Sequence, residues 1–179
     1  MLPHPSVLPR VPQLSGSILL RLVSLLLLAV PLAKAAPSKS CCIIDLDVQF
    51  GDVANYYGLK AKTSVVDLIE AGDRMDNVMV REAVIASRRG PQVIAAPAEM
   101  NPLEEISGDR LQQLLRICRN EFDLVLLDLP SNWTNWVLST VVGCDQLMLL
   151  TEPSLHSIRR ARRCLDLLES VGVTHSQTS

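Results

Sequence analysis

The sequence contains few aromatic residues and carries almost no net charge. Phe, Trp and Tyr make up 3% of its 179 residues, and the formal net charge is −2. Proteins bind nucleic acids with basic surfaces and with aromatic side chains on which bases stack. The composition therefore predicts a protein that does not bind nucleic acid, and the length suits one globular domain.

Cysteine and histidine are also too few and too scattered to indicate a disulfide framework or a metal centre. The cysteines are odd in number and show no CxxC spacing, so a complete disulfide framework is not expected. Most lie inside apolar runs, where a thiol behaves as a small hydrophobic group and indicates a reducing compartment. The cysteines are Cys41, Cys42, Cys118, Cys144 and Cys164, and the three histidines are dispersed.

The first forty residues include a leucine-rich run that allows two interpretations. The run, residues 22–33, is shorter than the roughly 20 residues of a membrane-spanning helix. Arg10 and Arg21 precede it and Ala33-Lys34-Ala35 follows, as in a cleaved signal peptide, so a signal or anchor is one hypothesis. Pro31 lies close to the supposed cleavage site and the following sequence looks cytosolic, which favours a buried or peripheral helix.

From residue 41 onward, apolar runs that predict strands alternate with stretches that predict helices. The strand runs are continuously apolar, which is typical of parallel strands buried on both faces. Their alternation with helices predicts an α/β fold with a doubly wound, mainly parallel sheet and helices on both faces. Strands are expected over 41–47, 92–97, 122–130 and 145–153, and helices over 63–72, 76–87, 107–121, 134–143 and 154–172.

Capping residues and apolar stripes define the expected helices. Ser64 and Asp67 form a capping box, Ser107 and Thr134 are expected N-caps, and Gly72 is a stop signal. Two helices carry an apolar stripe that should pack on the sheet. The stripe residues are Leu111, Leu114, Leu115 and Cys118 in one helix, and Leu155, Ile158, Ala161, Leu165 and Leu168 in the other.

Acidic side chains follow several of the predicted strands. Asp45 and Asp47 end the first strand, Asp128 ends the run "LVLLD", and Glu152 ends the last. In such sheets, ligands bind at the carboxyl ends of the strands, so these side chains are expected to converge. Asp128 fits the Walker B pattern, in which a carboxylate holds Mg²⁺ beside phosphate oxygens. The alternative is an ordinary strand end whose aspartate caps the next turn.

Three segments together resemble a known family. In their order and spacing, "IIDLDVQFGDVA", "LLDLP" and "LLTEPSLHSIRRARRCLDLL" resemble the MinD/ParA class of P-loop ATPases. They are most similar to its Tad/Flp pilus assembly branch, the CpaE/TadZ type, and the D-L-D-x-Q-F-G-D run is the most specific match. The resemblance covers residues 38–172. It implies an ATP-dependent, dimerising switch that uses ATP and Mg²⁺ to position pilus machinery.

The resemblance also implies roles for individual residues. Asp47 matches the switch I acid that orients the attacking water and approaches the metal, and Asp128 matches the Walker B metal ligand. The other matches are nucleotide-site positions, with the last two bordering the adenine: Asp45, Asp52, Glu152 and Pro153. As alternatives, Asp45 only braces its loop and Glu152 only caps the helix that opens near Ser154.

The sequence departs from this family at both ends. The glycine-rich P-loop should precede residue 41, but Gly16 is the only glycine in the first fifty residues, and Lys39-Ser40 enters a strand instead of following one. The resemblance also stops near residue 172, where relatives continue, and a receiver-like N-terminal domain is missing. We therefore divide the chain into an atypical segment 1–37, a nucleotide-binding-type domain 38–172 and a tail 173–179.

These departures leave the enzymatic activity open. The chain is a fragment or frame-disturbed copy, a scaffold that no longer binds nucleotide, or the product of a different start site.

If the family function holds, a cytoplasmic homodimer that contacts pilus assembly proteins at the inner membrane is expected. Peripheral association with that membrane is one alternative, because a helix rich in basic residues can contact anionic lipid. The basic residues are Arg159, Arg160, Arg162 and Arg163. The spacing of Arg162 and Asp166 favours a solvated face instead. Trp136 is expected to pack in a core or interface.

Overall fold

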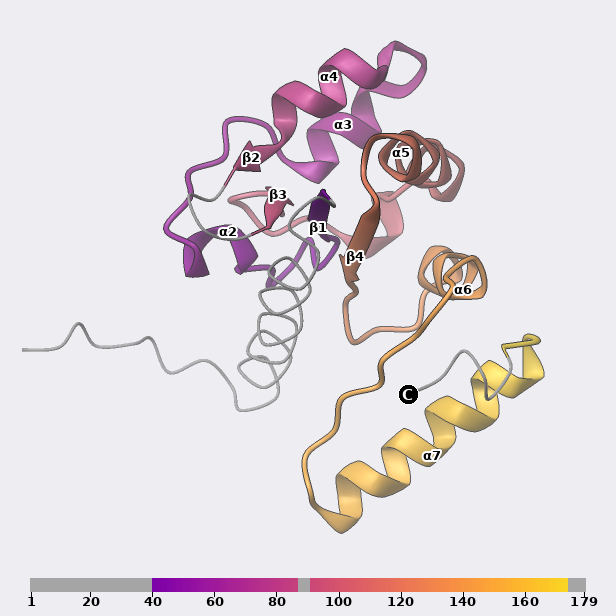
Figure 1. The fold of residues 1–179 in the computed structure, drawn as a ribbon. Helices are drawn as coiled ribbons and strands as arrows, with labels where there is room; N and C mark the ends of the chain where they lie inside the picture. Colours follow the sequence, from indigo (N-terminus) through magenta and orange to yellow (C-terminus); the bar gives the residue numbers. More distant parts are fainter. Residues whose placement is uncertain (1–39, 87–90, 174–179) are drawn as a thin grey trace, which may run out of the picture.

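The computed structural model describes residues 40–86 and 91–173, which form a four-stranded sheet with surrounding helices (Figure 1). The strands are β1 (Cys41–Asp45), β2 (Ile85–Ala86), β3 (Gln92–Ile94) and β4 (Leu124–Asp128), in the order β2-β3-β1-β4. β1 is parallel to both β3 and β4, whereas β2 pairs antiparallel to β3 at the edge. The expected α/β fold with a mostly parallel sheet is confirmed.

Helices and 3₁₀ turns cover both faces of the sheet. A large core lies against α3, α4, α5 and α6, and a small core of Ile43, Val53 and Val93 lies on the α2 side. β1 is buried along its whole length, as its continuous apolar sequence predicts. The elements are α2 (Val53–Tyr56), α3 (Val65–Ala71), η1 (Gly72–Arg74), α4 (Asn77–Ala83), η2 (Leu103–Glu105), α5 (Gly108–Glu121), α6 (Asn135–Val142) and α7 (Leu155–Ser170).

Most of the expected helix caps form, with one exception. Ser64 and Asp67 make the reciprocal capping box of α3, and Gly72 ends that helix at φ 57°. The Thr134 side chain accepts from the Val137 N–H at the start of α6. Ser107 is the N-cap residue of α5, but its side chain makes no capping hydrogen bond, so that part of the prediction is wrong.

One strand expectation and one helix expectation need correction. No strand forms over residues 145–153, where Met148 and Leu150 keep 42% and 38% of their surface exposed. An apolar run becomes a strand only when a neighbour completes its hydrogen bonds, and no described strand lies beside it. The helix expected over 76–87 ends at Ala83, and the β-branched Ile85 starts β2.

The last helix forms where the sequence predicts it, but it does not pack as expected. Of its apolar stripe only Leu168 is buried, whereas Leu155 and Ile158 are 79% and 56% exposed. Arg162 and Asp166 form the expected ion pair at 2.9 Å. Figure 1 shows α7 well away from the sheet.

The remaining expectations are met in part. Trp136 is buried and donates its indole N–H to the Leu103 carbonyl at 2.9 Å. Cys41, Cys42 and Cys118 are buried thiols, whereas Cys144 and Cys164 are half-buried. Val173, the last described residue, is buried. Within the part of the chain that the structure describes, every helix is too short or too polar to cross a bilayer. The expectations for residues 1–37 and 174–179 lie outside the described residues.

Candidate functional site

A pair of buried carboxylates lies at the carboxyl ends of the two central strands. Asp45 and Asp128 are direct partners in the parallel register of β1 and β4. Only 1% of Asp45 and 8% of Asp128 is exposed to solvent. The parallel sheet brings them together because both strands end at the same edge, as predicted from the apolar runs that precede them.

The loop after β1 folds over Asp45. Its Oδ1 accepts a hydrogen bond from the Asp47 N–H at 3.3 Å, and its Oδ2 accepts one from the Val53 N–H at 3.1 Å. Gly51 passes so close that an added Cβ would lie 2.6 Å from Asp45 Oδ2 and 2.5 Å from the Cβ of Ala96. The loop therefore requires glycine at position 51 to enclose this carboxylate.

Burial makes the charged form of Asp45 unfavourable. Desolvation, and then the nearby charge of Asp128, raise the pKa of Asp45 to about 8, while hydrogen bonds from the Val53 and Asp47 N–H groups oppose the shift. At neutral pH the carboxyl therefore holds a proton for much of the time. A cation placed beside the pair would reverse this preference, because a positive charge stabilises both carboxylates.

The other predicted site residues have different environments. Asp47 is buried, and its Oδ1 accepts from the Phe50 N–H at 3.2 Å. Asp52 is half-buried and turns toward α2, where it accepts from the Asn55 side-chain amide at 2.7 Å. Glu152 and Pro153 are exposed on the connection into α7. Glu152 was expected to converge with the carboxylates from the end of a strand, and no strand is present there among the described residues.

The carboxylates at this edge suit a Mg²⁺ ion that keeps water or phosphate ligands, rather than a metal ion held by protein side chains alone. Across residues 40–86 and 91–173, no three His, Cys, Asp or Glu side chains gather in an arrangement that could hold a metal ion. Mg²⁺, however, is usually held by one or two carboxylates together with water and substrate phosphate. Asp45 and Asp128 fit that smaller requirement. The described glycines are dispersed and provide no glycine-rich phosphate cradle.

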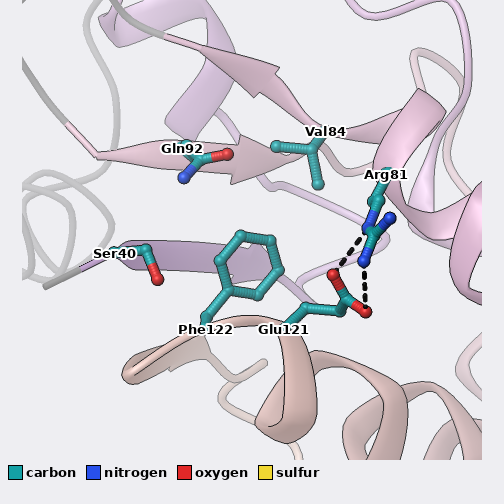
Figure 2. Close-up of a pocket in the computed structure, with 6 residues that line it drawn as sticks. All are labelled: Ser40, Arg81, Val84, Gln92, Glu121 and Phe122. Carbon is teal, nitrogen blue, oxygen red and sulfur yellow. Dashed lines mark hydrogen bonds and ion pairs between the residues drawn. The ribbon is translucent and has the colours of Figure 1, made fainter.

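A small cavity lies at the opposite end of the sheet from the carboxylates. It has a volume of about 250 Å³ and is lined by Ser40, Arg81, Val84, Gln92, Glu121 and Phe122 (Figure 2). Arg81 and Glu121 close one side with an ion pair at 2.6 Å. Since Ser40, Gln92 and Phe122 lie at the amino ends of parallel strands, this cavity is separate from the carboxylate edge.

Sequence reasoning missed the main-chain parts of the site. The Val53 N–H and the close approach of Gly51 both help to enclose Asp45, yet neither depends on a recognisable side chain. The signal that could have found Gly51 is its position in the loop directly after the Asp-rich strand end. Nothing in the local sequence indicates that the Val53 amide points at a residue eight positions earlier.

The sequence is similar to curated MinD proteins. It is 24% identical to the septum site-determining protein MinD of Bacillus subtilis over 140 residues, which covers 76% of this chain and 51% of that protein. The Synechocystis septum site-determining protein MinD is 23% identical, with 77% and 51% covered. This chain thus spans about half the length of these relatives. No protein-family model matches it.

Solved structures share the fold. A ParA family ATPase from Chlorobium tepidum superimposes with a TM-score of 0.74 at 22% identity, covering 89% of this chain and 65% of that one. The septum site-determining protein MinD from Pyrococcus horikoshii, solved with Mg-ADP, gives a TM-score of 0.71 at 13% identity, with 90% and 63% covered. The fold is that of the ParA and MinD P-loop ATPases, and the sequence similarity supports this class.

Proposed function

We propose that this chain is a MinD/ParA-type nucleotide switch in which Asp45, Asp47 and Asp128 form the magnesium side of the site. The observation that carries the proposal is the buried pair of Asp45 and Asp128 at the carboxyl edge, with the pKa of Asp45 raised to about 8. Two adjacent buried acids are costly to ionise together, and a divalent cation beside them would lower that cost. The Mg-ADP named for the Pyrococcus horikoshii relative supports the choice of ligand.

Each residue of the proposed site has a different role. Mg²⁺, when bound with nucleotide, would neutralise charge on the phosphate oxygens. Asp128 would hold it directly or through water, Asp45 would add negative charge behind it, and Asp47 would orient a water. Asp52 would lie near the nucleotide or a dimer partner, and Glu152 and Pro153 would border the base. These last roles rest on the sequence resemblance alone.

The biological setting of the proposed switch is the positioning of a cellular structure. The named relatives act in septum-site determination, which favours a positioning function. The D-L-D-x-Q-F-G-D run favours the Tad/Flp pilus assembly branch, so the proposed client is pilus machinery at the inner membrane. In this proposal the chain works in the cytoplasm as a homodimer whose assembly follows the nucleotide state.

A second candidate function is a scaffold that binds partners but no nucleotide. It is favoured by one observation on this sequence, in which Gly16 is the only glycine of residues 1–50. In this case the carboxylate edge would still shape the loop over residues 46–52, but no Mg-ATP would bind. Partner binding would then survive the loss of a site carboxylate.

Calorimetric titration of the purified chain with ATP, with and without Mg²⁺, separates the two functions. The switch predicts saturable binding that requires Mg²⁺ and is lost in Asp128→Asn, which removes the charge but keeps the shape. The matched control is Asp145→Asn, an exposed aspartate outside the site, which should bind as the wild type does. No binding by the folded wild-type chain would reject the switch and leave the scaffold.

A further inference from the structure

The described helices cover the two faces of the sheet unequally. α3, α4, α5, α6 and α7 all contribute buried residues to the large core, whereas α2 alone contributes one to the small core. α2 is a helix of four residues that packs against β3. A parallel sheet whose strands are continuously apolar is typically covered by helices on both faces. The α2 side is therefore the face on which further cover is expected.

β4 carries the apolar side chains of this face that lie farthest from α2. Leu126 packs on the small core, whereas Val125 and Leu127 pack on the large one. Since side chains alternate along a strand, Leu124 lies on the same side as Leu126. Both leucines are only half-buried, and β4 lies two strand spacings, roughly 10 Å, from β3. Leu124 and Leu126 thus form an apolar surface that a further helix could bury.

Residues 18–30 have a helical pattern with one wholly apolar side. At 3.6 residues per turn, Arg21, Ser24 and Leu28 fall on one side of such a helix. Pro31 would end the helix. Its length would be roughly 20 Å, compared with roughly 17 Å for β4, so it is long enough to cover both leucines. The residues on its apolar side are Leu19, Leu22, Val23, Leu26 and Val30.

The same segment is attached close to this face. Residues 31–39 connect it to Ser40, which directly precedes β1. When extended, this connection spans roughly 30 Å, which exceeds the roughly 17 Å length of β1. A short flexible tether also holds a segment at an effective concentration of roughly millimolar. The segment therefore has an advantage over any separate partner for this face.

We propose that residues 18–30 form a helix that covers Leu124 and Leu126 on the α2 side of the sheet. The apolar side of the helix faces the strands, and Arg21 and Ser24 face solvent. The leucine-rich run then belongs to the fold of this domain and is not a membrane anchor. The docking does not depend on the nucleotide switch proposed above.

The docked helix also reaches the surroundings of the carboxylate pair. It completes the small core, to which Val53 contributes a fully buried side chain. The Val53 N–H donates to Asp45 Oδ2 at 3.1 Å. Holding Val53 in place therefore also holds the loop that encloses Asp45.

A scan of paired cysteines in the full chain tests the docking. Leu126→Cys is combined with one further cysteine, at position 19, 22, 23, 26 or 30 on the apolar side, or at position 21, 24 or 28 on the other. A disulfide requires Cα atoms within about 7 Å, so only a side chain that faces the strand can form one. Under mild oxidation, at least one pair of the first set should link within the chain and none of the second should. Peptide mass spectrometry separates these links from those of the native cysteines. Links from both sides of the helix, or from neither, overturn the proposal.

The matched substitutions Leu26→Asp and Leu28→Asp provide a second test. Leu26→Asp places a carboxylate against the strands, which is unfavourable without a partner, whereas Leu28→Asp adds one to the solvent side. The midpoint of urea denaturation should therefore fall by ~1 M or more for Leu26→Asp and stay near that of the wild type for Leu28→Asp. Failure of Leu26→Asp alone to fold would agree with the same prediction. Equal midpoints reject the docking, and if the wild-type chain then also sediments with phosphatidylglycerol vesicles, the run belongs to a membrane surface.

Discussion

At the scale of single residues, Asp45 couples the stability of the fold to pH. An aspartate in the unfolded chain loses its proton near pH ~3.9, whereas burial, and then the charge of Asp128, raise the pKa of Asp45 in the folded chain to about 8. The folded state therefore binds more protons than the unfolded state between these two values. It follows that its stability falls as the pH rises through this window and levels off above it.

We expect the free energy of unfolding of the nucleotide-free chain to decrease between pH 5 and pH 8, with a slope approaching ~1 kcal/mol per pH unit from this group. Asp45→Asn cannot ionise, so urea denaturation across this range should give a shallower slope and a relative gain at pH 8. Asp145→Asn, which removes an exposed carboxylate, should keep the wild-type slope. Equal slopes for Asp45→Asn and the wild type would contradict the buried-acid description of the site.

The sequence predicted which carboxylates lie at the site, but it did not predict that a loop encloses Asp45. Asp45 and Asp128 follow apolar runs, and a parallel sheet brings such strand ends to one edge. The enclosure depends instead on the path of a loop, which brings the Val53 N–H and Gly51 onto Asp45. That path is a property of the packed fold and leaves no local pattern in the sequence.

At the scale of elements, two serine caps make a matched comparison. The Ser64 hydroxyl accepts from the Asp67 N–H, and the Asp67 carboxylate accepts in return from the Ser64 N–H at 2.6 Å. Ser107 occupies the same N-cap position of α5 without a side-chain bond. Both look alike in the sequence, because a serine before an amphipathic run is the signal for a cap.

We expect Ser64→Ala to lower the free energy of unfolding by ~1 kcal/mol, since it removes one capping bond and the bond to the Asp67 carboxylate. Ser107→Ala should change it by less than about half as much, because no side-chain bond is lost. Chemical denaturation of the two variants beside the wild type measures the difference. Similar losses for both would show that Ser107 also caps its helix.

Local sequence patterns predicted most of the helices and strands. The errors concern which segments pair with a neighbouring strand. Hydrophobic periodicity identified α5, and continuous apolar runs identified β1 and β4. The run over 145–153 has the same apolar character, yet it forms no strand, because a strand also needs a neighbour that the run itself does not specify. β2 was missed for the opposite reason, since two residues paired with β3 give no periodic signal.

At the scale of the whole molecule, the described chain is tightly packed around β1, whereas α7, near the end of the described residues, buries much less of its surface. β1 has a strand on each side and is fully buried. α7, in contrast, buries only Leu168, and Val173 just beyond it also reaches the core. The exposed Leu155 and Ile158 give the amino-terminal part of α7 no comparable attachment. Local stability should therefore differ between these two regions.

This difference in local stability predicts that Leu168→Ala detaches α7 from the core without unfolding the sheet. Removing a buried leucine side chain costs about 2–5 kcal/mol where the site cannot collapse, and Leu168 is the one fully buried residue of α7. Hydrogen exchange should show amides of residues 155–170 losing protection in the variant while those of β1 keep theirs. Leu155→Ala, which truncates a side chain that is 79% exposed, should leave both regions unchanged. If β1 lost protection together with α7, the helix would instead be part of one cooperative unit with the sheet, and its exposed stripe would have to be stabilised by contacts beyond residue 168.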